Sequence, residues 1–338
     1  MVSSRVRVSL LIVVVFVAAV AVGFAYWGTM TGPTNPPAKH QLIVSTTTSL
    51  YETGFLDVLT NSFESKYQNI NVSFISQGTG LAIQTAMRGD ADMILVHDPP
   101  SELKFLEGGY GVDRKIVAYN YFVIVGPADD PAHIKGLAPL DAMRRIADAG
   151  RQGQAEWVSR GDKSGTNQAE KRLWNSCGLD NETTRQEAWY IESGTGMAAT
   201  LNMANQKNAY TLSDLGSYTK NFKDGNIQLE VMVQAELLDT LNVYSAIVCD
   251  PRKPVLNETN FEDAVLFVKY LVSPEGQALF EEYGIEQYGM RLFNPYIPLL
   301  TSPNGTEVLS WIQTFAFFNN TECPTQFRYQ AGDLYLGT

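Results

Sequence analysis

Short apolar runs alternate with amphipathic segments along most of the chain from residue 41 onward. The run at 41–45 (QLIVS) is typical of a strand, and apolar residues then recur at helical spacing between Phe55 and Phe63. Strands are predicted at 41–45, 71–75, 92–96, 121–125, 156–159, 189–191, 209–212, 229–233 and 243–248. Helices are predicted at 52–66, 81–88, 140–149, 164–176, 197–206, 261–271 and 274–283, and from Ser213 onward. These repeated strand–helix–strand units indicate an α/β fold with largely parallel sheets and helices on both faces.

The first 39 residues stand apart from this pattern. Residues 8–27 carry no charge and are long enough to cross a bilayer as a helix. Arg5 and Arg7 precede this run, so the positive-inside rule leaves the N-terminus in the cytoplasm and exports the remainder. A cleaved signal peptide is the alternative, because a small-x-small pattern (AVA) occurs within the run. Residues 28–37 (GTMTGPTNPP) then form an extended tether, and both interpretations place the body on the outer face of the membrane.

The amino-acid composition excludes some classes of function. The 338 residues include 36 acidic and 25 basic side chains, a net charge of −11, and 45% of them are hydrophobic. This length and apolar content suit one large folded domain or two of ordinary size. No dense cluster of lysine and arginine occurs, which excludes a nucleic-acid-binding protein. A small anion is not excluded, because one binding site needs only a local ring of donors.

The cysteines and glycosylation sequons are consistent with an exported protein. Cys177, Cys249 and Cys323 have no metal-ligand spacing, so either two of them form a disulfide or all are buried as small apolar residues. Asn-x-Ser/Thr sequons, the acceptors of N-glycosylation, begin at Asn71, Asn181, Asn257, Asn304 and Asn319.

Four predicted strand-to-helix junctions are small, hydroxylated and rich in glycine. They lie at 45–49 (STTTS), 77–80 (QGTG), 159–166 (SRGDKSGT) and 192–197 (ESGTGM). In open parallel sheets, ligands bind at the carboxyl ends of the strands, where helix N-termini present backbone N–H groups. One such turn is most often a helix cap. Together the four offer hydroxyls, N–H groups and one guanidinium with few acceptors, which suits a deprotonated oxyanion.

Two other classes of protein are the alternatives to an oxyanion receptor. A hydrolase would use Ser164 as nucleophile with Asp162 or His133, but the chain has no G-x-S-x-G, HExxH or P-loop sequence, so no enzyme is expected. A tethered oxyanion sensor remains open, because it would share the same cleft. His97 is assigned no role, since no other metal-ligand residues are spaced around it, and neither a metal ion nor a cofactor is expected.

Five long runs resemble the tungstate-binding extracytoplasmic receptors of ABC transporters. The runs lie at 45–57, 89–100, 109–137, 158–174 and 194–218, and the similarity extends over about residues 41 to 295. This resemblance implies a two-lobed fold like that of type II periplasmic-binding proteins, with each lobe a mostly parallel sheet flanked by helices. Two hinge strands join the lobes, which close over a tetrahedral oxyanion. The implied partners are tungstate and a membrane permease; molybdate, phosphate and sulfate are alternative ligands, and a monomer is expected.

The resemblance also implies how the chain is divided. The hinges fall near 121–125 and 241–248. The segment 301–338 departs from the family, and its many aromatic residues predict that it packs on the body or on a partner. The implied parts are 1–39 (anchor or signal segment with tether), 40–125 and 236–300 (lobe 1), 126–235 (lobe 2) and 301–338 (C-terminal extension).

Residue by residue, the resemblance assigns ligand donors to both lobes. Arg160 matches the arginine of the family's SRGD segment and is the candidate for a direct charge contact. Ser164, Gly165 and Thr166 would offer backbone N–H groups and a hydroxyl at the start of the following helix. The other assigned residues are Thr46, Thr47, Thr48 and Ser49 of the TTTS signature, with Thr79, Thr195, Gly196 and Met197.

Protonation predicts how such a pocket selects its ligand. Tungstate and molybdate only accept hydrogen bonds near neutral pH, so a pocket of donors without a facing carboxylate favours them over hydrogen phosphate. Asp162 is expected to turn back and cap the helix near Ser164, because a carboxylate facing a dianion would repel it. Sulfate is smaller and is expected to bind weakly. The choice of tungstate over molybdate rests on the resemblance alone.

Overall fold

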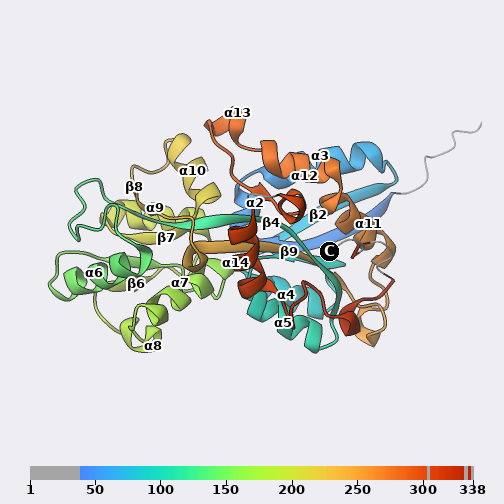
Figure 1. Ribbon diagram of the computed structural model, residues 1–338, viewed down its shortest axis with the longest axis horizontal. Coiled ribbons are helices and arrows are strands. Elements are labelled where there is room, and N and C mark those ends of the chain that lie inside the picture. The colour runs from blue at the N-terminus through green and yellow to red at the C-terminus, as the bar shows by residue number, and fades with distance from the viewer. Residues whose placement is uncertain (1–38, 303–304, 331–333, 336–338) are drawn as a thin grey trace, which may run out of the picture. The chain divides into compact units, whose positions relative to one another are not determined.

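A computed structural model describes residues 39–302, 305–330 and 334–335 of the chain (Figure 1). The predicted membrane span at 8–27 and the tether at 28–37 lie outside the described residues. Among the helices that are described, none has the length and apolar character needed to cross a membrane. The chain divides into the units 1–40 and 41–338, and the second unit is described below by itself.

The elements confirm the predicted alternation of strands and helices. The strands are β1 (His40–Thr47), β2 (Ile70–Gln77), β3 (Met93–Val96), β4 (Gly111–Gly126), β5 (Trp157–Ser159), β6 (Tyr190–Glu192), β7 (Thr211–Asp214), β8 (Glu230–Gln234), β9 (Leu241–Cys249) and β10 (Asn294–Pro295). The helices are α2 (Thr48–Glu52), α3 (Phe55–Lys66), α4 (Thr79–Met87), α5 (Pro99–Glu107), α6 (Pro139–Arg151), α7 (Gly165–Ser176), α8 (Asn181–Thr184), α9 (Met197–Lys207), α10 (Leu215–Lys223), α11 (Phe261–Val272), α12 (Pro274–Glu282), α13 (Ile285–Tyr288) and α14 (Thr306–Ala316). The helix predicted at 52–66 is divided by a turn at Gly54, whose φ of 81° is unfavourable for other residues.

The strands β4 and β9 connect the two parts of the sheet. The strand order is β10–β4–β9–β3–β1–β2, and β7 and β8 also pair with β4. β4 pairs with β9 as far as Tyr121 and with β7 and β8 from Phe122 onward. The pairs β1–β3 and β5–β6 are parallel, as expected, but the pairs that β4 and β9 form are antiparallel. The difference has a simple cause, because the chain crosses between the two parts along β4 and returns along β9.

Two lobes follow from this topology. In the first lobe, helices cover both faces of the sheet that contains β1, β2, β3 and β9, with α3 and α11 on one face and α4 and α5 on the other (Figure 1). In the second lobe, α6 to α10 surround β7 and β8 at the other end of β4 (Figure 1). The boundaries 40–125 with 236–300 and 126–235 remain our proposal for the limits of the lobes.

The described part of the C-terminal segment packs on the first lobe. Ile312 and Ala316 of α14 are fully buried in a cluster with Leu241 and Val243 of β9. Further along, the buried carboxylate of Glu322 pairs with the ammonium of Lys115 and accepts a hydrogen bond from the N–H of Ile116 at 3.1 Å. The segment 301–338 is therefore expected to stabilise the first lobe, because a buried charge needs its partner.

The burial of the cysteines and of the described sequon asparagines decides between the alternatives that the sequence left open. Cys177, Cys249 and Cys323 are all buried and free, which is the second of the two alternatives that the sequence left open. Asn181 is buried and so is not a glycosylation acceptor in the folded protein, whereas Asn257 and Asn319 are exposed.

Candidate functional site

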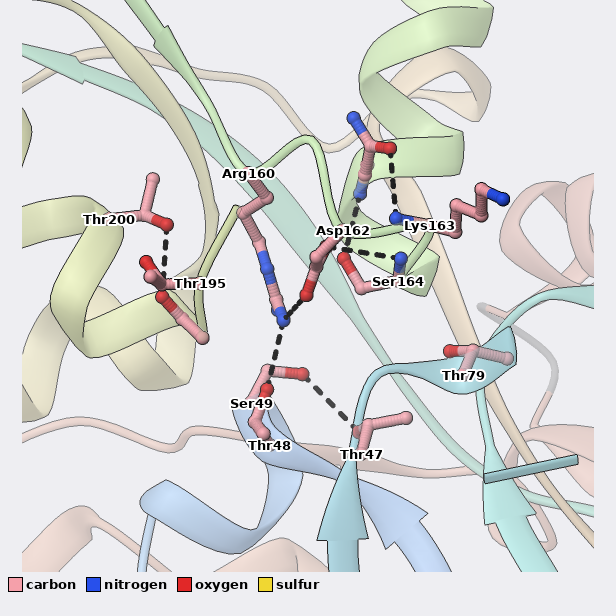
Figure 2. A network of polar contacts seen from close by, with 12 residues as sticks. Thr47, Thr48, Ser49, Thr79, Arg160, Asp162, Lys163, Ser164, Thr195 and Thr200 are labelled. Carbon is pink, nitrogen blue, oxygen red and sulfur yellow. Dashed lines mark hydrogen bonds and ion pairs between the residues drawn. The ribbon is translucent and has the colours of Figure 1, made fainter. Parts of the chain in front are cut away.

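Arg160 lies between the two lobes, directly after β5. Its side chain is only 1% exposed, and Nη2 donates a hydrogen bond to Thr48 Oγ1 of the first lobe at 2.9 Å (Figure 2). The same nitrogen pairs with Asp162 Oδ2 at 2.5 Å. Nε and Nη1 are also buried, and neither has a hydrogen-bond partner among the residues that the structure describes. Because buried polar groups are almost always paired, these two nitrogens are available to a further acceptor.

Asp162 turns back to the start of α7, as the sequence predicted. Its Oδ1 accepts a hydrogen bond from the N–H of Ser164 at 3.1 Å, while Oδ2 holds Arg160 (Figure 2). The hydroxyl of Ser164 accepts a hydrogen bond from the N–H of Asn167 at 3.2 Å and so caps α7. Both side chains are therefore engaged in building the loop that presents Arg160.

The first turn of α7 contacts the first lobe. The N–H of Gly165 donates to Thr79 Oγ1 at 3.0 Å, and both residues are buried. The hydroxyl of Thr166 is buried and has no hydrogen-bond partner in the part of the chain that the structure describes. The start of α7 therefore adds one unpartnered hydroxyl to the two free N–H groups of Arg160.

The four residues of the TTTS run have different roles. Thr46 Oγ1 donates to the carbonyl of Leu95 at 2.8 Å within the sheet, and Thr47 Oγ1 accepts from the N–H of Leu50 at 3.4 Å and caps α2. Thr48 accepts the hydrogen bond from Arg160 described above. The hydroxyl of Ser49 lies 3.3 Å from that of Thr47. The hydroxyl of Thr48 thus faces the second lobe, whereas those of Thr46, Thr47 and Ser49 contact groups of the first lobe.

Of the three residues predicted to bind the ligand in the turn before α9, the structure does not place all next to the first lobe. Thr195 is exposed, and its hydroxyl donates to Ser193 Oγ within its own turn at 3.2 Å. Met197 is fully buried in the core of the second lobe. Only Gly196 lies against the first lobe, where a Cβ would be 3.6 Å from the side chain of Thr48.

His97 contributes to the site, although the sequence gave no reason to assign it a role. Asn242 donates through Nδ2 to Asn120 Oδ1 at 2.8 Å, so its Oδ1 accepts the hydrogen bond from His97 Nδ1 at 2.7 Å. The other ring nitrogen, Nε2, therefore accepts from the hydroxyl of Ser49 at 3.3 Å. Burial lowers the pKa of His97 to about 4, so the ring is neutral at physiological pH and orients Ser49.

Besides Asp162, two carboxylates that the sequence did not indicate, those of Glu52 and Asp214, interact electrostatically with the Arg160 guanidinium. Burial raises the pKa of both Glu52 and Asp214, and Arg160 opposes that rise. Asp214 Oδ1 accepts a hydrogen bond from the N–H of Ser217 at 2.9 Å, and no described residue donates to its buried Oδ2. Nothing in the sequence indicates that Glu52 or Asp214 belongs to the site, because only the folding of the chain brings either residue toward Arg160.

Gly165 leaves no space for a side chain. A Cβ at this position would lie 2.7 Å from the ring of His97, which Asn242 holds in place. We therefore expect Gly165→Ala to push the start of α7 away from His97 and to lower the free energy of unfolding by about 1–3 kcal/mol, the usual cost of an overpacked contact. Urea unfolding of the purified variant measures this effect, and an unchanged midpoint would show that the ring moves aside.

Comparison with known proteins identifies the class. Residues 31–275 match the model of the PBP superfamily domain, and the chain belongs to this superfamily. A Haloferax volcanii protein, named for anion binding in an ABC transporter, is 45% identical over 263 residues, which are 76% of this chain and 72% of that protein. The tungstate-binding protein TupA of Peptoclostridium acidaminophilum is 37% identical over 259 residues, 76% of this chain and 86% of that protein.

A solved structure points to the same group. The tungstate ABC transporter structure from Geobacter sulfurreducens has a TM-score of 0.65 and 38% identity, and the match covers 73% of this chain and all of that one. The chain is thus homologous to the tungstate-binding proteins of ABC transporters, which confirms the resemblance and the two-lobed fold. These relatives are transport proteins and not enzymes, as expected for this chain.

Proposed function

We propose that this protein is an extracytoplasmic receptor that captures tungstate between its two lobes and delivers it to the permease of an ABC transporter. The observation that carries the proposal is the guanidinium of Arg160, which is buried between the lobes with two N–H groups unpartnered. A tetrahedral oxyanion has several acceptor oxygens and would satisfy these groups. The names of the relatives supply the choice of tungstate.

In this proposal, donors from both lobes bind the anion. Arg160 Nε and Nη1 and the hydroxyl of Thr166 would donate from the second lobe. The hydroxyls of Thr48 and Thr79 would face them from the first lobe, because each accepts a hydrogen bond, from Arg160 and from Gly165, and so keeps its proton for the anion. Ser49, whose hydroxyl donates to His97, would support this turn. Contacts of this kind form only when the lobes are closed, so anion binding would favour the closed form that docks on the permease.

Ligand selection and location belong to the same proposal. Asp162 is engaged with Arg160 and with the N–H of Ser164, so it would not face the anion. Molybdate is the nearest alternative ligand, and hydrogen phosphate and sulfate are expected to bind more weakly. The body would be a monomer at the outer face of the membrane, either held by residues 8–27 or released after cleavage.

Thermal unfolding in the presence of four anions tests the proposal. Tungstate, and to a similar degree molybdate, should stabilise the protein by about 4 kcal/mol at a thousand times the dissociation constant. Sulfate and phosphate at the same concentration should shift the midpoint much less. No shift with any of the four anions would contradict the oxyanion receptor, and a shift with phosphate alone would change the ligand class.

A further inference from the structure

The N-terminus of α9 receives its capping acceptor from the opposite lobe. α9 begins after Gly196, which has no side chain that could cap the helix. Glu52, the last residue of α2, instead accepts a hydrogen bond from the N–H of Ala198 through Oε2 at 3.1 Å. The first N–H groups of a helix have no partner within the helix, and the dipole favours a negative charge there. Glu52 thus joins the lobes by a bond that exists only while they are in contact.

The turn before α9 is shaped to admit this carboxylate. A Cβ at Gly196 would lie 3.1 Å from Glu52 Oε1 and 3.6 Å from the side chain of Thr48. Met197, the next residue, is fully buried in the core of the second lobe, which holds the turn in place. A side chain at position 196 would therefore displace Glu52 or separate the lobes.

Glu52 and Thr48 project from the same face of α2. They are four residues apart in a helix, a spacing that places side chains next to each other. Thr48 accepts a hydrogen bond from Arg160 at 2.9 Å, and Glu52 accepts one from Ala198 at 3.1 Å. Two separate loops of the second lobe therefore hold one face of one short helix. An anion bound to Arg160 would stabilise the same contact, so anion binding and the Glu52 bond reinforce each other.

We propose that Glu52 is a positioning residue for anion capture, which holds α9 against α2 in the closed form and slows release of the bound anion. This inference rests on the proposed function, and it adds a residue that acts by holding the two lobes together and does not bind the anion itself. Its carboxylate contacts the start of α9, where Oε2 accepts a hydrogen bond from the N–H of Ala198 and Oε1 lies against Gly196.

Substitutions at Glu52, made in the full chain with tungstate as the probe, test this role. Glu52→Ala should weaken tungstate binding about tenfold, the effect of one lost charge-assisted hydrogen bond. Most of the loss should appear as faster release in stopped-flow measurements, because the bond forms only after the anion has entered. Glu52→Gln keeps an oxygen that can accept the N–H of Ala198 and should stay within about threefold of the wild type.

Glu64→Ala is the matched control. Glu64 Oε1 accepts a hydrogen bond from the N–H of Val72 at 2.8 Å, but both residues belong to the first lobe. This variant should lower the unfolding midpoint and leave tungstate affinity unchanged. The role of Glu52 would be contradicted if Glu52→Ala kept the wild-type affinity and release rate, or if Glu64→Ala lost as much affinity. Neither result would contradict the proposed function. If wild-type protein does not bind tungstate, the proposed function is overturned as well.

Discussion

Replacing Arg160 by alanine is expected to weaken tungstate binding by at least about a hundredfold, because two charge-assisted hydrogen bonds would be lost, each worth about 1.5–3 kcal/mol in its context. The side chain supplies two buried nitrogens, Nε and Nη1, that have no hydrogen-bond partner in the described part of the chain. Its loss would also leave the Oδ2 of Asp162 without its cation. Calorimetric titration of the purified variant with tungstate measures the effect.

Two further variants separate charge from geometry at this position. Arg160→Lys keeps the positive charge but not the planar array of donors, so its affinity should lie between those of the wild type and Arg160→Ala. Lys163 lies three residues further on and has an exposed side chain, so Lys163→Ala should bind tungstate as the wild type does. Unchanged affinity in Arg160→Ala would show that the arginine only supports the loop.

Glu170→Ala is expected to lower the free energy of unfolding by about 3 kcal/mol, because removing a buried acceptor leaves several donors unsatisfied. Glu170 of α7 is fully buried, and its carboxylate accepts hydrogen bonds from Trp157 Nε1 at 2.7 Å, Ser159 Oγ at 2.7 Å and Tyr190 OH at 2.5 Å. These donors come from β5 and β6, so the residue ties the helix to the small sheet that precedes Arg160. Urea unfolding, followed by circular dichroism, measures the loss.

Glu182→Ala provides the comparison for Glu170→Ala. Glu182 is exposed in the nearby helix α8 and forms ion pairs with Lys171 and Arg185 at the surface. Exposed ion pairs contribute little, so this variant should stay within about 0.5 kcal/mol of the wild type. Equal unfolding midpoints for the two variants would mean that the Glu170 cluster is not a main support of the second lobe.

Most of the strands could be predicted because their apolar residues follow one another along the chain. The first half of β4 was missed, since it contains Asp113, Arg114 and Lys115 and looks like an exposed loop. Arg114 and Lys115 are nonetheless buried, because Glu102 pairs with the first and Glu322 with the second. A charge that is neutralised by a residue about two hundred positions away leaves no local signal.

Besides the short helices α2, α8 and α13, the two helices α5 and α14 were missed, for different reasons. α5 begins with Pro99 and Pro100, which in sequence suggest a turn, although proline is well tolerated in the first turn of a helix. α14 lies in the segment where the family resemblance ends, and its packing against β9 could not be inferred without the fold.

The candidate site was predicted in part. The loop of Arg160 and the start of α7 do meet Thr48 and Thr79 of the first lobe, because each of these segments follows a strand whose end lies where the lobes meet. Spacing alone could not decide where a hydroxyl points, so Thr46 and Thr195 appeared equivalent to Thr48.

The sequence by itself determined the class of fold, the family and the loops that form the cleft, since these depend on local periodicity and on motifs that are continuous in the chain. Only the tertiary structure decided which donors are left without partners. It also decided that Asp162 binds both Arg160 and the N-terminus of α7. It alone brought His97, Glu52 and Asp214 near the other residues of the site. The physical reason is that hydrogen-bond satisfaction and burial depend on groups brought together from distant parts of the chain.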